Sequence, residues 1–235
     1  MFESIDNYCE RIGSAFWAEP FNALTNLAFI VAAYFGWKMM KRLSVQSLGH
    51  VFLISVLFTI GVGSFLFHTF ATRWAELADI IPILIFQITF LWLYSREVIL
   101  LNRFWATLAM SVFFVVVGMG FQMKVLLGLG PEDPSPVNGS EMYAGALVGV
   151  LALAVYHLVA EKKSRFMLLG AFGFFCLSLT FRTLDMAVCD VWPLGTHYLW
   201  HLCNAGVLYL SLRALLLNVS IEQIPWEEHE RGVSA

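Results

Sequence analysis

Charged residues are scarce in this sequence. Only 13% of its 235 residues are Asp, Glu, Lys or Arg, whereas an average soluble domain has about 25%. Hydrophobic residues make up 59%, and the aromatic share reaches 15%. A soluble fold of this length cannot bury so much apolar surface, and a disordered chain would be poor in aromatic residues and rich in charge. The composition excludes both classes and predicts a protein with several membrane spans.

Basic runs and cysteines are also few. The 14 Lys and Arg residues form no run longer than two, and the net charge is −3, so we expect no nucleic-acid partner. Four cysteines are too few for a disulfide framework. Residues 1–19 carry four acidic side chains, whereas a signal peptide begins with basic ones, so we expect no cleavable signal peptide.

Seven apolar stretches are long enough to cross a bilayer, which takes about 20 residues per helix. They fall at about 20–40, 50–70, 79–95, 104–123, 141–160, 166–182 and 194–217. Short polar segments separate them, and the sequence shows no internal repeat. We therefore predict an all-α membrane protein in which residues 1–235 form a single seven-helix transmembrane domain. Residues 1–19 would be an N-terminal segment outside the bundle, and residues 218–235 a tail.

The basic residues predict the orientation of this bundle. With seven crossings, four of them lie on the side of the N-terminus: Arg11, Arg73, Lys124 and Arg182. The other ten lie on the opposite side. Because Lys and Arg accumulate on the cytoplasmic side of membranes, we expect the N-terminus outside and the C-terminal tail in the cytoplasm.

Histidine is the most informative polar residue in the spans, because ionisable groups in a bilayer are costly and point to function. His197 and His201 are four residues apart at the start of the seventh span, so they share a helix face. His68 ends the second span, on the same side of the membrane. Three protein ligands with an open fourth position are typical of catalytic zinc. The other three are expected to have no metal-binding role: His50, His157 and His229.

Two more polar residues fall at the depth of these histidines. Ser64 lies four residues before His68, and Asp79 begins the predicted third span eleven residues after it. At that position Asp79 could also cap its helix. From the residues alone, three interpretations stay open: a zinc site, polar residues that pack helices together, or a haem held by His68 and one of the other two.

Four sequence blocks occur in a specific order and spacing. They are YCER followed by FWAEPFNALTN, GVGSFLFH with an aspartate eleven residues on, RTLDMAVCD, and HYLWH. With these blocks the chain resembles the alkaline ceramidase family of seven-span membrane hydrolases, over nearly its whole length. The resemblance implies a zinc-dependent hydrolase that cleaves ceramide or a related N-acyl lipid to a fatty acid and a lipid amine. A receptor or sensor of the related progestin and adiponectin receptor type is the alternative, followed by a bis-histidine haem protein.

The resemblance also implies a role for each site residue. His68, His197 and His201 would bind Zn²⁺. Asp79 would hold or deprotonate the attacking water, and Ser64 would stabilise the tetrahedral intermediate. The substrate would enter sideways from the lipid bilayer, toward a site near the outer or lumenal face.

The family further binds calcium through its N-terminal segment. The resemblance places oxygen ligands at Asp6, Asn7, Tyr8, Glu10 and Glu19, which are of the kind calcium takes. The stretch between the two glutamates looks shorter here than in the animal enzymes, and an isoleucine stands where an asparagine ligand would be. A calcium site and a solvated acidic segment therefore remain alternatives.

Further expectations concern the cysteines and one charged pair. The resemblance implies a disulfide between Cys9 and Cys189, both on the predicted outer side, where such bonds persist. The other two cysteines lie inside spans and are expected to be free thiols. Arg182 and Asp185 are three residues apart at the end of the sixth span, and we expect them to form an ion pair there, with a contact to the substrate as the alternative.

Overall fold

The computed structural model describes residues 3–130 and 135–219. Within these residues the regular structure is helical, apart from one isolated bridge between Ser4 and Thr72. Seven segments have the length and composition of membrane spans. They are α1 and α2 (Pro20–Thr25 and Leu27–Leu43), α3 (Leu48–Phe70), α4 with the π-helical turn η1 (Arg73–Leu93 and Tyr94–Val98), α5 (Arg103–Phe121), η2 with α7 (Ser140–Tyr143 and Ala144–Val159), α8 (Met167–Leu184) and α9 (His197–Asn218). Short helices α6 (Met123–Leu126) and η3 (Met186–Val188) lie between spans. The predicted all-α fold with seven spans is confirmed.

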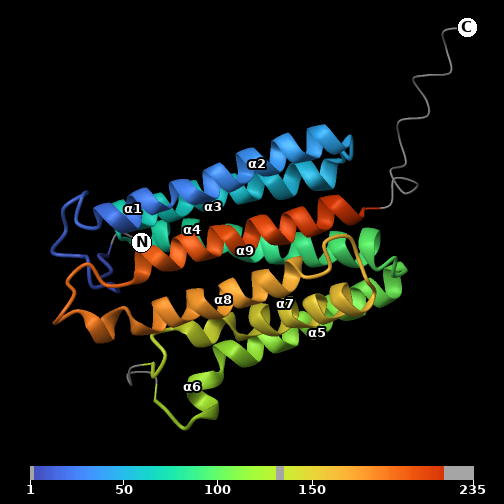
Figure 1. Ribbon diagram of the computed structural model, residues 1–235. Coiled ribbons are helices and arrows are strands. Elements are labelled where there is room, and N and C mark those ends of the chain that lie inside the picture. Colours follow the sequence, from blue (N-terminus) through green and yellow to red (C-terminus); the bar gives the residue numbers. More distant parts are fainter. Residues whose placement is uncertain (1–2, 131–134, 220–235) are drawn as a thin grey trace, which may run out of the picture.

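The spans pack into a closed bundle (Figure 1). In chain order each long helix contacts the next, from α2 through α3, α4, α5, α7 and α8 to α9, and α9 returns to contact α2. Helix α9 also contacts α3 and α4, and α3 and α9 are the two most buried spans. The residues carried by α3 and α9 are therefore the best shielded from the surroundings.

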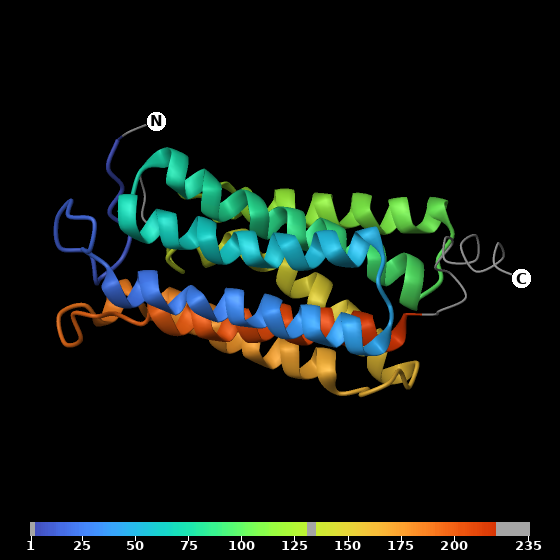
Figure 2. The same cartoon turned by 90° about the horizontal axis from the view of Figure 1, so that it is seen from above.

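The bundle has two distinct ends, which Figure 2 shows from above. At one end, α3 finishes and α9 begins, and the N-terminal segment lies across them; we call this the site end. At the other end, α2 and α9 finish and α3 begins; we call this the far end.

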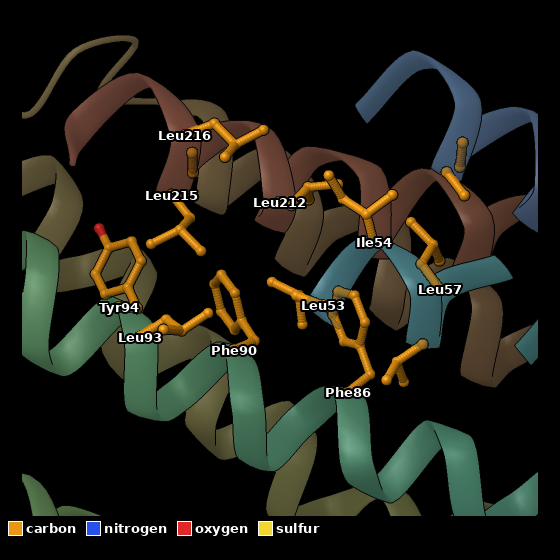
Figure 3. Close-up of a cluster of buried hydrophobic side chains, with 14 of the residues drawn as sticks. Leu53, Ile54, Leu57, Phe86, Phe90, Leu93, Tyr94, Leu212, Leu215 and Leu216 are labelled. Carbon is orange, nitrogen blue, oxygen red and sulfur yellow. The ribbon is translucent and has the colours of Figure 1, made fainter. Parts of the chain in front are cut away.

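The core between the spans is made of close-packed apolar side chains. Figure 3 shows leucine and isoleucine side chains of α3 and α9 meeting aromatic side chains of α4. Leu53, Leu57, Leu212 and Leu215 are fully buried. Many large apolar side chains of the outer faces are exposed instead, as suits a lipid environment. The chain is a multi-pass integral membrane protein.

Two sequence expectations are corrected or lie beyond the described residues. The third span begins at Arg73, after Thr72 as N-cap, and not at Asp79. Asp79 therefore lies inside α4, so its proposed capping role is wrong. The tail from residue 220 onward, with His229, lies outside the described residues.

Candidate metal centre

Three histidines meet at the site end. His68 lies in the last turn of α3, whereas His197 and His201 lie in the first two turns of α9. Each offers one ligand atom, and these atoms lie within 4.8 Å of one another. All three side chains are buried. The topology and spacing thus bring the three histidines together; we call them the histidine triad. Among residues 3–130 and 135–219, the triad is the only group of three His, Cys, Asp or Glu residues with this geometry.

The hydrogen bonds of the triad suit a metal ion. His68 Nδ1 contacts Glu19 Oε2 at 2.6 Å, and His201 Nδ1 contacts Thr25 Oγ1 at 2.9 Å. The buried Nε2 atoms of both rings have no hydrogen-bond partner, and neither has Nδ1 of His197. Unpaired buried nitrogens are costly unless something binds them. A ligating histidine commonly donates its other nitrogen to a carboxylate or similar oxygen, which is the arrangement seen here.

Aromatic rings enclose the triad. The Tyr8 ring stacks on His197 with centroids 3.7 Å apart, and the Trp200 ring stacks on the same imidazole at 5.1 Å. Tyr8 contacts both His197 and His68, and these contacts hold the N-terminal segment against the triad. Burial raises the pKa of the Tyr8 phenol above its ordinary value, so this hydroxyl stays protonated.

Ser64 and Asp79 face the same layer from α3 and α4. Ser64 lies one helical turn before His68, and both Ser64 Oγ and Asp79 Oδ1 are buried without a hydrogen-bond partner. Gly63 explains the close approach of the two helices, because a Cβ there would overlap the Ala78 carbonyl oxygen and lie 3.3 Å from the Asp79 nitrogen. Pro82 has no N–H to donate to that carbonyl. The structure therefore places the Ser64 hydroxyl and one Asp79 oxygen without a hydrogen-bond partner near the triad.

The expected ion pair between Arg182 and Asp185 is absent from the described residues. The Asp185 carboxylate accepts N–H groups from Thr196 (2.7 Å), His197 (2.9 Å) and Cys9 (3.1 Å). The Thr196 and His197 groups are free donors at the start of α9, where a carboxylate is favourable, and the Cys9 group belongs to the N-terminal segment. Asp185 thus fixes the position of His197.

Arg182 instead lies against aromatic rings. Its guanidinium carbon is 5.4 to 5.9 Å from the ring centroids of Tyr8, Tyr143 and Trp200. One N–H donates to the Tyr8 hydroxyl at 3.2 Å, and Nε is buried without a partner. The expected pair is wrong because the start of α9 offers Asp185 two N–H groups and Cys9 offers a third, whereas the rings offer Arg182 cation–π contacts.

The comparison with protein families adds to this geometry. A family model described as Ceramidase matches residues 2–230. The chain belongs to the ceramidase family. No curated protein matches it. Membership indicates a membrane hydrolase that acts on a lipid, in agreement with the resemblance drawn from the four sequence blocks.

In this member of the ceramidase family, Cys9 and Cys189 form a disulfide. The bond joins the N-terminal segment to the connection between α8 and α9. Gly195, at φ +62°, makes room for it, because a Cβ there would lie 2.7 Å from Cys9 Cβ. The other two cysteines, Cys176 and Cys203, are free.

The expected calcium ligands do not form a comparable cluster. Asp6 and Asn7 are exposed. Both carboxylate oxygens of Glu10 accept backbone N–H groups at the start of α1, from Phe21 (2.6 Å) and Asn22 (2.8 Å). Burial raises the pKa of the Glu10 carboxyl above its ordinary value, against the effect of these two bonds. A calcium site stays a prediction.

Glu19 has a different set of partners. It contacts His68, accepts an N–H from Asn22 and pairs with Arg11. Burial alone would raise the pKa of Glu19, but the hydrogen bonds from His68 and Asn22 and the Arg11 charge outweigh it and lower the pKa. Sequence reasoning assigned Glu19 to calcium and gave no role to Arg11 or Thr25. These contacts join residues far apart in the chain, and no local spacing signals them.

A narrow apolar cavity of about 70 Å³ lies deeper in the bundle. Its walls come from all seven spans and include Trp200, which also contacts the triad. Aliphatic and aromatic side chains form most of its lining, and the aromatic ones include Phe29, Phe86, Phe90, Phe113 and Phe175. Gln87 and Asn204 add polar groups. Such a lining suits a hydrocarbon chain with few polar groups.

Proposed function

We propose that the protein is a zinc-dependent intramembrane hydrolase that cleaves the amide bond of ceramide or a related N-acyl lipid. The products are a fatty acid and a lipid amine. One observation carries the proposal: the buried histidine triad has unpartnered nitrogens and lies beside a serine hydroxyl and an aspartate oxygen that also have no hydrogen-bond partner. Ceramidase family membership supports the lipid amide as substrate.

The triad fits zinc in chemistry and in protonation. Thr25 Oγ1 donates its own proton to the Phe21 carbonyl at 2.8 Å, so its contact with His201 is one in which the imidazole Nδ1–H donates. Glu19, a carboxylate, likewise accepts Nδ1–H from His68. Both rings then present a bare Nε2. When bound there, Zn²⁺ would polarise the substrate carbonyl and lower the pKa of water to about 7.

The other residues supply proton transfer and charge stabilisation. Asp79 accepts the proton of the attacking water and passes it to the amide nitrogen as the carbon–nitrogen bond breaks. The Ser64 hydroxyl donates a hydrogen bond to the carbonyl oxygen of the substrate as that oxygen gains negative charge. One water is consumed, so the acyl group leaves as a carboxylic acid and the nitrogen leaves as an amine.

The substrate is held by its apolar part. The acyl chain lies against the aromatic and aliphatic walls of the cavity, and the amide reaches the triad past Trp200. The free Nε–H of Arg182 donates a hydrogen bond to a polar group of the lipid. The positive-inside distribution of Lys and Arg supports a site near the outer or lumenal face. The triad atoms are too close together for a haem, because the third imidazole would lie where the macrocycle must be.

The test combines metal analysis with a hydrolysis assay on protein purified in detergent. We expect about one zinc per chain, no haem absorption band, and release of fatty acid from an N-acyl sphingoid lipid. His68→Ala, His197→Ala and His201→Ala should each lose the metal and the activity, whereas Lys41→Ala at the far end should keep both. Unchanged zinc content in all three histidine variants would rule out the proposed centre.

A further inference from the structure

Arg11 is a buried cation next to the histidine triad. Its side chain is 2% exposed and pairs with Glu19 through Nε. The other two guanidinium nitrogens donate to backbone carbonyls, of Gly13 at 3.2 Å and of His68 at 3.1 Å. A buried charge is costly unless it is paired and hydrogen-bonded. Here each guanidinium nitrogen has a partner, so the surrounding residues compensate for the burial of this charge.

Arg11 holds His68 at two points. It binds the His68 carbonyl directly, and it binds Glu19 Oε1 while Glu19 Oε2 accepts from the imidazole Nδ1. The bidentate reach of a guanidinium allows both contacts at once. Loss of the cation would leave the Glu19 carboxylate buried without its charge partner and free to turn away from His68.

The same contacts occupy the glutamate oxygens that a divalent ion would use. All four carboxylate oxygens of Glu10 and Glu19 accept hydrogen bonds from the protein. Calcium takes six to eight oxygen ligands and would have to break these bonds. It would also lie against the positive charge of Arg11, which repels it.

We propose that Arg11 is a positioning residue that acts as the built-in cation of the N-terminal segment, so that Glu19 and His68 are held in place without calcium. The proposal rests on the proposed function only in treating His68 as a metal ligand. It excludes the calcium site that the family resemblance implies.

The first experiment uses the unmodified protein. After treatment with EGTA, we expect no bound calcium by elemental analysis. Titration with 1 mM CaCl₂ should then leave the unfolding temperature unchanged within about 1 °C. One bound calcium per chain, or a clear rise in the unfolding temperature with calcium, would overturn the proposal. This result does not depend on zinc or on activity, so it stands even if the hydrolase proposal fails.

The second experiment replaces the cation. Arg11→Gln should weaken zinc binding about 10- to 100-fold, the usual effect of losing a group that supports a metal ligand, measured by competition with a zinc chelator. Arg11→Lys should recover part of the affinity, because it restores the charge but not the two-point contact. Zinc affinity depends on the position of His68. If Arg11 served only the stability of the fold, its replacement would leave the zinc affinity unchanged.

The matched control is Arg73→Gln at the same end of the bundle. Arg73 pairs with Glu76 in an exposed position, so its loss should leave zinc affinity unchanged. Equal zinc affinities in Arg11→Gln and Arg73→Gln would contradict the proposal. If Arg11→Gln does not fold, the zinc affinity of Arg11→Lys tests the positioning of His68, and the calcium titration of the unmodified protein tests the exclusion of calcium.

Discussion

Buried histidines occur at both ends of the bundle, and their hydrogen bonds differ. At the far end, the two nitrogens of His50 contact the Val45 carbonyl (2.6 Å) and Glu97 (2.7 Å). Those of His157 contact the Tyr94 hydroxyl (2.5 Å) and the Lys163 carbonyl (3.2 Å). Every ring nitrogen there has a protein partner, so these histidines need no further ligand.

At the site end, one nitrogen of each triad histidine has no partner, and neither have Ser64 Oγ and Asp79 Oδ1. Burial is the same at both ends, so burial alone does not mark a functional histidine. The difference lies in unsatisfied donors and acceptors, which a stable fold tolerates where a ligand or substrate completes them. Substitutions at the two ends should therefore change different properties.

The largest expected effect is on catalysis, from Asp79→Asn. The amide has nearly the shape of the carboxylate but cannot accept the proton, so we expect kcat to fall about 100- to 10,000-fold. The zinc content should not change. The unfolding temperature should not fall, because the replaced Oδ1 has no partner to lose. A kinetic assay with metal analysis and thermal unfolding on the same preparation tests all three.

Glu76→Gln provides the matched control for Asp79→Asn. Glu76 lies one turn earlier in α4 and pairs only with the exposed Arg73 among the described residues. Its substitution should leave kcat within about twofold. A similar loss of activity in both variants would show that charge in α4, and not proton transfer at Asp79, controls the rate.

The second prediction concerns the cross-link that only the site end has among the described residues. The Cys9–Cys189 disulfide joins residues 180 apart, and the loss of a native disulfide typically costs about 2–5 kcal/mol. Cys9→Ser should lower the unfolding temperature by about 5–15 °C. It should also loosen zinc binding, because the Cys9 N–H bonds to Asp185, which positions His197.

Two measurements check the disulfide prediction. Thiol labelling of the unfolded, unreduced protein should find the two free cysteines, Cys176 and Cys203, and a count of four would contradict the bond. Cys203→Ser should keep the original unfolding temperature to within a few degrees, since that thiol is free. A reductant should destabilise the original protein and leave Cys9→Ser unaffected.

Much of this comparison was predictable from sequence. The apolar stretches predicted the seven spans because backbone groups in lipid must bond within their own helix. The odd number of crossings, together with the spacing of His197 and His201, placed three histidines at one end and two at the other. These are consequences of geometry along one chain.

The sequence could not predict which side chains become partners across the fold. Asp185 bonds to the start of α9 instead of to nearby Arg182, because three backbone N–H groups surround it only in the folded protein. Arg11 reaches His68, 57 residues away, and no pattern signals such a pair. The early start of α4 was detectable: Thr72 and Glu76 are typical of a helix N-terminus, but their polarity suggested a loop.

The smallest effect is expected at the far end, from Tyr94→Phe. The change removes the hydroxyl that contacts His157 Nδ1 and leaves a buried nitrogen unpaired, at a cost of about 1–3 kcal/mol. We expect the unfolding temperature to fall by about 2–10 °C, with zinc content and kcat unchanged. Tyr34→Phe, at an exposed position of α2, should change none of these. Ser64→Ala gives the opposite pattern at the site end: it removes a hydroxyl without a partner, so the rate should fall while stability holds. If Tyr94→Phe lowered zinc content or kcat as much as Ser64→Ala, the two ends would be coupled, and satisfied histidines could not be separated from functional ones by their hydrogen bonds alone.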